Sequence, residues 1–145
     1  MSEPARYVAA VAVIVFRGDR LLAMRRAPDK DAAPGAWEVL SGRVDPGEQP
    51  YDAAAREAFE ESGLEIAIDP RPVVAYQAKR NRDDMLVVVY RGRCDAGEVR
   101  LSVEHDASAW MTLEEFAAAC RFAPLVEAVR RARAIDCGPP AGEGG

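Results

Sequence analysis

The longest apolar run of the chain covers residues 7–16 and has no polar side chain at helical spacing. Val, Ile and Ala dominate the run, so it predicts a strand that is buried on both faces. Gly18-Asp19 then predicts a hairpin turn into a second strand at residues 20–24. The run is shorter than the roughly 18 residues that a membrane-spanning helix needs, and no small-residue cleavage site follows it. We therefore expect a cytoplasmic protein that does not act on membranes.

A helix is predicted from Pro50 to Ser62. Pro suits its first turn, residues 53–59 are good helix formers, and Gly63 suits a left-handed cap, after which Leu64 is expected to pack on Phe59. Shorter patterns predict the other elements: loops at 27–35 and 79–84, strands at 37–40, 73–78, 85–93 and 108–111, a helix after the N-cap Thr112, and a helix at 124–134.

Strands that alternate with two or three helices favour the α/β class, with a mixed β-sheet covered on both faces. The 145 residues, of which 49% are hydrophobic, suffice for one domain with a full core. We place this domain at residues 1–136. Residues 137–145 are mostly Gly and Pro and are expected to form a disordered tail.

The charge and the cysteines exclude several classes of function. A formal charge of -5 argues against long nucleic acid as a partner, because such binding comes mostly from neutralising phosphates. A small phosphorylated ligand needs only a local cationic pocket. The three cysteines are widely spaced and form no cluster with the single His105, which argues against a zinc site. The sequence is compatible with a monomer or a homodimer.

The predicted helix at 50–62 carries three carboxylates on one arc. At about 100° per residue, Glu57, Glu60 and Glu61 share one side of the helix, and apolar residues occupy the other. Like charges at this spacing repel each other, and the C-terminal end of a helix disfavours anions. A bound hard cation would compensate, because Mg²⁺ prefers oxygen ligands. The alternative is a solvated acidic face balanced by Arg56, which is what most charge runs are.

The wider pattern favours the cation. In the segment from Gly42 to Leu64 the chain resembles the Nudix hydrolase family, whose signature is G-x5-E-x7-R-E-U-x-E-E-x-G-U, with U an apolar residue. Its positions are occupied in register by Gly42, Glu48, Arg56, Glu57, Ala58, Glu60, Glu61, Gly63 and Leu64. Where many members have Pro-Gly-Gly, this chain has Leu40-Ser41-Gly42. The resemblance implies the Nudix-type α/β/α sandwich.

The resemblance also implies roles for these residues. Glu57 and Glu61 would bind the divalent ion, Mg²⁺ or Mn²⁺, with Glu60 as a further ligand or as the general base. The carbonyl of Gly42, or of Ser41, would be another ligand. Glu48 and Arg56 would form the ion pair that fixes the loop against the helix, so the catalytic set is Glu48, Arg56, Glu57 and Glu60.

The implied reaction is hydrolysis of the diphosphate linkage in a small nucleoside diphosphate derivative, by attack of water on phosphorus. The alternative is a nucleotide-binding or sensor module without catalysis, although such modules usually lose the metal glutamates. Isopentenyl diphosphate isomerase shares the fold but needs several histidines, and this chain has one.

Other residues have weaker claims to the site. Arg25 and Arg26 are candidates for binding substrate phosphates, with a solvated strand end as the alternative. Glu104 precedes His105 where some family members place an acidic residue near the metal, but a structural role is favoured. Core packing is favoured for Trp37, and a solvated loop for Lys79, Arg80 and Arg82.

Overall fold

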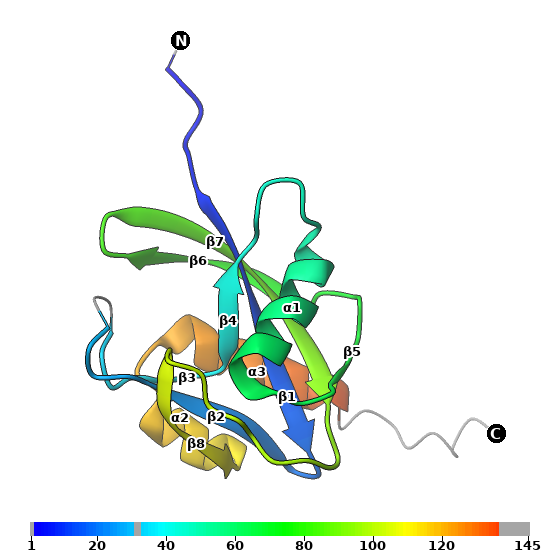
Figure 1. Ribbon diagram of the computed structural model, residues 1–145. Helices are drawn as coiled ribbons and strands as arrows, with labels where there is room; N and C mark the ends of the chain where they lie inside the picture. The colour runs from blue at the N-terminus through cyan, green and yellow to red at the C-terminus, as the bar shows by residue number, and fades with distance from the viewer. Residues whose placement is uncertain (1, 31–32, 137–145) are drawn as a thin grey trace, which may run out of the picture.

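The computed structural model describes residues 2–30 and 33–136. Within these residues, three helices cover one mixed sheet (Figure 1). The predicted tail at 137–145 lies outside the described residues. The strands are β1 (Val8–Arg17), β2 (Arg20–Arg26), β3 (Trp37–Glu38), β4 (Leu40–Arg43), β5 (Ala67–Ile68), β6 (Val74–Arg80), β7 (Asp83–Arg93) and β8 (His105–Met111); the helices are α1 (Pro50–Ser62), α2 (Leu113–Ala119) and α3 (Ala123–Asp136).

Strand β1 lies at the centre of the sheet. Along one edge it pairs in parallel with β7, from Val8 opposite Met85 to Phe16 opposite Arg93. Its other partners, β2 and β4, are antiparallel. Strand β8 extends the sheet beyond β2, and β6 extends it beyond β7. The mixed sheet that the sequence predicted is therefore confirmed.

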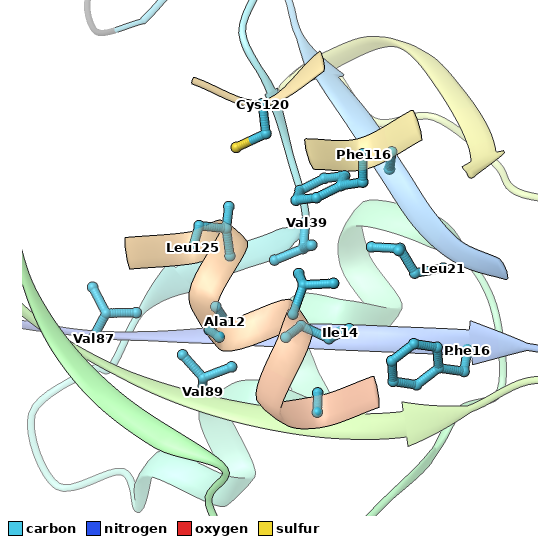
Figure 2. Packing of buried hydrophobic residues seen from close by; sticks show 14 of the residues in the cluster. Ala12, Ile14, Phe16, Leu21, Val39, Val87, Val89, Phe116, Cys120 and Leu125 are labelled. Carbon is cyan, nitrogen blue, oxygen red and sulfur yellow. The ribbon is translucent and has the colours of Figure 1, made fainter. Parts of the chain in front are cut away.

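Alternate side chains of β1 enter two separate cores. Ala12, Ile14 and Phe16 pack with residues of α2 and α3, such as Phe116 and Leu125 (Figure 2). Val11, Val13 and Val15 point to the opposite face and pack with Ala53, Ala54 and Ala58 of α1. This period of two explains why residues 10–16 are all apolar: both faces of the strand are covered there, whereas Tyr7 and Ala9 at the start of the predicted run are exposed. The predicted α/β/α sandwich is confirmed.

Helix α1 has the predicted bounds. Pro50 occupies its first turn, and Gly63 adopts the left-handed conformation with φ of 69° and donates its N–H to the Phe59 carbonyl at 2.8 Å. Leu64 is buried in the core beneath α1, whereas Phe59 remains 60% exposed. Thr112 caps α2 through a reciprocal pair of hydrogen bonds with Glu115, as its position predicted.

Several predicted boundaries were wrong. The loop at 79–84 is a tight turn, because β6 continues to Arg80 and β7 begins at Asp83. Strand β8 begins at His105, three residues earlier than expected, because it pairs with β2 along its length. Strand β5 was missed, since its two residues are recognisable only by their pairing with β7. None of the described helices is long and apolar enough to cross a membrane.

Candidate active site

The loop before α1 is fastened to the helix by Glu48 and Arg56. The guanidinium donates from Nε and Nη2 to the two Glu48 oxygens, each at 2.9 Å. Glu48 also accepts the backbone N–H of Asp45 at 3.0 Å. The Arg56 hydrogen bond, followed by the Asp45 N–H, lowers the pKa of Glu48 to about 2. This bidentate pair fixes the direction in which the loop approaches the helix.

Arg56 also holds the acidic face of α1. Its Nη1 donates to Glu57 at 2.8 Å and contacts Glu60 at 3.4 Å. Its Nη2 reaches the carbonyl of Arg43 at 3.1 Å, so one side chain joins the end of β4, the loop and the helix. The hydrogen bonds that Arg56 donates to Glu48 and Glu57 raise the pKa of Arg56 well above its usual range, and the group stays charged.

Glu61 is the most buried carboxylate of this face, at 6% exposure. It accepts the backbone N–H of Ser41 at 2.9 Å, which connects α1 to β4. Burial raises its pKa to about 8, and the charges of Glu38, Glu57 and Glu104 act in the same direction; the Ser41 N–H opposes them. Among the described residues Glu61 forms no ion pair, so its ionised form would be a buried charge without compensation.

Glu57 lies against Gly42 of β4. A Cβ atom added to Gly42 would overlap the Glu57 carboxyl group, so only glycine leaves room for this side chain. Burial raises the pKa of Glu57, although the hydrogen bond from Arg56 opposes the shift. Strand β4 thus accommodates Glu57 at Gly42 and Glu61 at Ser41. The segment Leu40-Ser41-Gly42, which stands in place of Pro-Gly-Gly, keeps both contacts. Glu61 needs only the backbone N–H of Ser41, and Glu57 needs only the absence of a side chain at Gly42.

The donor chemistry of this face fits a hard divalent cation. In the described part of the chain no three Asp, Glu, His or Cys side chains already form a cluster that could hold an ion. Glu57 and Glu60 instead contact Arg56. Glu57 and Glu61 are nevertheless carboxylates with raised pKa, the shift expected where buried anions lack sufficient positive charge. Oxygen donors of this kind are the ligands that Mg²⁺ or Mn²⁺ prefers.

A cavity of about 420 Å³ adjoins the carboxylates across β4. Ser41, Gly42 and Arg43 form one wall of it. The opposite walls come from the β6–β7 hairpin and the start of α3, and they are largely apolar. The other polar residues in the walls are Glu38, Lys79, Arg80 and Asn81, and the aromatic ones are Trp37, Tyr76 and Phe122.

The weaker sequence candidates lie in different places. Arg25 is half-exposed and pairs with Asp106 at 2.8 Å, which raises its pKa. Arg26 is buried and lies 3.6 Å from Glu38. Glu104 pairs with Lys30 at 3.1 Å, and its charge still acts on Glu61. Neither arginine is among the residues in the cavity wall, so their proposed role in phosphate binding stays a prediction.

Sequence reasoning missed Glu38. This residue lies in the cavity wall, and its carboxylate accepts a hydrogen bond from the fully buried His105 at 2.8 Å. The two residues are far apart in the chain and meet because β2 pairs with both β3 and β8. The only signal in the sequence was a glutamate inside an apolar segment.

Together, the fold and the site define an α/β protein in which an acidic helix faces a glycine-containing strand end. The sequence model of the NUDIX domain family matches residues 6–132, which is most of the chain. The chain therefore belongs to the NUDIX family.

Curated relatives support the assignment to this family. A MutT-like protein of Streptomyces ambofaciens is 32% identical over 114 residues, which are 79% of this chain and 69% of that protein. A mouse bis(5'-nucleosyl)-tetraphosphatase (asymmetrical) is 30% identical over 110 residues, 72% of this chain and 75% of that protein. An octanoyltransferase of Myxococcus xanthus is 36% identical over 140 residues, or 92% of this chain, but the chain spans only 38% of its length.

The fold also matches solved structures. The crystal structure of a MutT protein from Methanosarcina mazei superposes with a TM-score of 0.82 at 21% sequence identity, and the match covers 94% of this chain and all of that one. At this identity the likeness concerns the fold alone.

Proposed function

We propose that this protein is a metal-dependent hydrolase that cleaves the diphosphate linkage of a nucleoside diphosphate derivative. The observation that supports it most directly is the pair Glu57 and Glu61: Glu61 is buried and Glu57 half-buried, both carboxyl groups have a raised pKa, and both lie against β4 beside a cavity. The mouse relative, which is named a bis(5'-nucleosyl)-tetraphosphatase, supports the substrate class.

The proposed ligands of the cation are Glu57, Glu61 and the carbonyl of Gly42. A bound Mg²⁺ or Mn²⁺ would supply charge neutralisation at the diphosphate oxygens. Arg56 would give up part of its contact with Glu57 and Glu60, so that these carboxylates can face the cation. It would keep its bidentate pair with Glu48, which positions the loop. The cavity beyond β4 would receive the nucleoside, so that the diphosphate lies across the strand end.

The proton of the attacking water needs an acceptor. We assign this role to Glu60, whose side chain is 56% exposed and can reach solvent beside the other two carboxylates.

The proposal is tested by incubating the protein with a panel of nucleoside diphosphate derivatives and identifying the products. Hydrolysis should require Mg²⁺ or Mn²⁺ and stop in excess chelator. Glu57→Gln and Glu61→Gln should each lower kcat by orders of magnitude and leave the protein folded. Glu127→Gln, on the exposed side of α3, is the control and should keep full activity. Undiminished turnover in chelator would contradict the proposal.

A nucleotide sensor without catalysis is the second candidate. All the carboxylates of the signature are present, and this favours the enzyme. Saturable nucleotide binding without any turnover of the panel, with both metals supplied, would favour the sensor instead.

A further inference from the structure

Arg25 lies between an aspartate and a tryptophan on one face of the sheet. Its Nε and Nη2 donate to the two carboxylate oxygens of Asp106, at 2.8 and 3.2 Å. Its guanidinium carbon lies over the ring of Trp37, 5.8 Å from the ring centre. A planar guanidinium can hold a carboxylate through two parallel hydrogen bonds and pack on an aromatic ring at the same time. We call these three connected side chains the Trp37 clamp.

The pairing of three strands brings the Trp37 clamp together. Trp37 of β3 and Ala107 of β8 both lie opposite Arg25 of β2, on the two edges of that strand. Between Arg25 and Arg26 the register of β2 and β8 shifts, which leaves Asp106 as the extra residue of a bulge. Side chains of a regular strand alternate between faces, so the chain neighbour of Ala107 meets Arg25 because the bulge turns it there.

The clamp ends at the cavity. Among the described residues that line the cavity, Trp37 is present, whereas Arg25 and Asp106 are not. Arg25 therefore contacts the ring from outside the cavity. Trp37 packs against the edge of the core beneath α2 and α3 but is only half-buried. A second contact on the ring consequently limits its rotation.

The ion pair in the clamp is too exposed to serve stability alone. The side chains of Arg25 and Asp106 are 42% and 36% exposed, and pairs of this kind contribute little to folding. The pair is bidentate, however, and two parallel hydrogen bonds fix the direction of a guanidinium group. Its effect is therefore geometric: the cation stays over the Trp37 ring.

We propose that Asp106 and Arg25 are positioning residues for the substrate: Asp106 fixes Arg25, and Arg25 holds the Trp37 ring as a rigid wall against the nucleoside. The ligand class rests on the proposed function. Arg25 then acts at the nucleoside end of the substrate and not on its phosphates. Asp106 acts without any contact with the substrate.

The first test observes the Trp37 ring without a ligand. The chain has two tryptophans, and Trp110→Phe leaves Trp37 as the only one. The phenylalanine keeps an aromatic ring beside Arg17, which packs on Trp110. In this background Arg25→Met should increase the quenching of Trp37 fluorescence by acrylamide and lower its anisotropy, because the ring loses its cover.

Asp106→Asn should change the fluorescence of Trp37 in the same direction and to a smaller extent. Arg131→Met removes a similar exposed ion pair on α3 and is the matched control, which should have no effect. Unchanged quenching and anisotropy in Arg25→Met would overturn the proposal, whichever substrate the protein hydrolyses.

The second test compares ligands with and without phosphate. AMP, GMP, CMP and UMP and their nucleosides are titrated in chelator by calorimetry. Arg25→Met should raise the dissociation constants of a nucleotide and its nucleoside equally, by about two- to fivefold, which is the size of one cation–π contact at a partly exposed site. Arg25→Lys keeps the charge but loses the two parallel hydrogen bonds, and it should behave like Arg25→Met.

With a hydrolysed substrate, these variants should raise KM and leave kcat unchanged, because the clamp does not contact the reacting groups. In a Trp37→Leu background, Arg25→Met and Asp106→Asn should cause no further loss of binding, because both act through the ring.

A loss of binding that is confined to the phosphorylated ligands and restored by Arg25→Lys would assign Arg25 to phosphate and overturn the proposal. Absence of binding by all four nucleotides would also contradict it. Hydrolysis of the nucleotide panel is measured separately. A failure of the proposed function would appear as absent turnover, whereas a failure of the clamp would appear as unchanged fluorescence of Trp37 in the ligand-free protein.

Discussion

At the scale of single residues, Glu61 is the most buried carboxylate of the site. It is buried beneath α1, with one backbone N–H as hydrogen-bond donor and three carboxylates nearby. Its pKa of about 8 in the folded protein lies far above the value of 4.5 for an unperturbed glutamate. The folded state therefore binds this proton more tightly than the unfolded state does, and stability depends on pH.

We predict that, in chelator, the unfolding temperature falls as pH rises from about 5 to 8. Glu61 contributes its stability in full below pH 4.5, where both states are protonated, and loses it as pH rises through the folded pKa of about 8. Glu57 acts in the same direction, because its pKa is also raised. Thermal unfolding across this pH range is the measurement.

Glu61→Gln should make the same curve flatter. The amide oxygen of glutamine can still accept the Ser41 N–H, but the side chain no longer titrates. Apo stability at pH 8 should be equal to or higher than that of the wild type. A wild-type slope in this variant would show that another group is responsible.

Gly42 allows a second prediction at this scale. Gly42→Ala would place a methyl group where Glu57 now lies, and the flexible Glu57 side chain would have to move. We expect activity to fall by about 10- to 100-fold, as for residues that position metal ligands, with stability changed by less than about 1 kcal/mol because a side-chain end can move cheaply.

Ser41→Ala is the neighbouring control, because it keeps the backbone N–H that binds Glu61. A double variant with Glu57→Ala checks the mechanism: the extra cost of Gly42→Ala should disappear when Glu57 is absent. An additive loss would place the effect of Gly42 elsewhere.

At the scale of elements, Arg56 connects α1 to the loop before it and to the end of β4. We predict that Arg56→Lys lowers kcat by about tenfold or more, because an ammonium group cannot reproduce the two parallel hydrogen bonds to Glu48. The unfolding temperature should fall as well. Steady-state kinetics and thermal unfolding measure the two effects.

Arg131→Lys provides the comparison on α3, since Arg131 pairs with Glu127 on an exposed face. It should change neither quantity, because exposed pairs contribute little. Equal activity in Arg56→Lys and the wild type would mean that charge alone holds the loop.

At the scale of the whole molecule, bound metal should stabilise the fold. The carboxylates of α1 meet the strand end at β4, so a cation there would link the helix to the central sheet. We predict that Mg²⁺ raises the unfolding temperature of the wild type, with about 2.7 kcal/mol gained at one hundred times the dissociation constant.

The same titration of Glu57→Gln and Glu61→Gln should give a much smaller rise. Mg²⁺-free buffer with matched ionic strength serves as the control for screening by salt. An equal rise in wild type and both variants would place the ion at another site.

The sequence alone determined the parts of this protein that depend on local chemistry. Residues 10–16 are apolar at every position because both faces of this part of β1 are covered, and this requirement was visible in the pattern. Pro50 and Gly63 fixed the ends of α1 by their own backbone preferences. The geometry of a helix placed Glu57, Glu60 and Glu61 on one arc, and the resemblance of the wider segment to the Nudix signature then favoured a bound cation over a solvated acidic face.

The tertiary structure alone decided which distant residues meet. Ser41 and Glu61 form their hydrogen bond because α1 packs on β4, and Glu38 reaches His105 because β2 lies between β3 and β8. Strand β5 exists only through its pairing with β7. Such contacts depend on register and on the packing of layers, and a periodicity along the chain carries no information about either. The acidic face of α1 could therefore be predicted from sequence, whereas the cavity and its Glu38 could not.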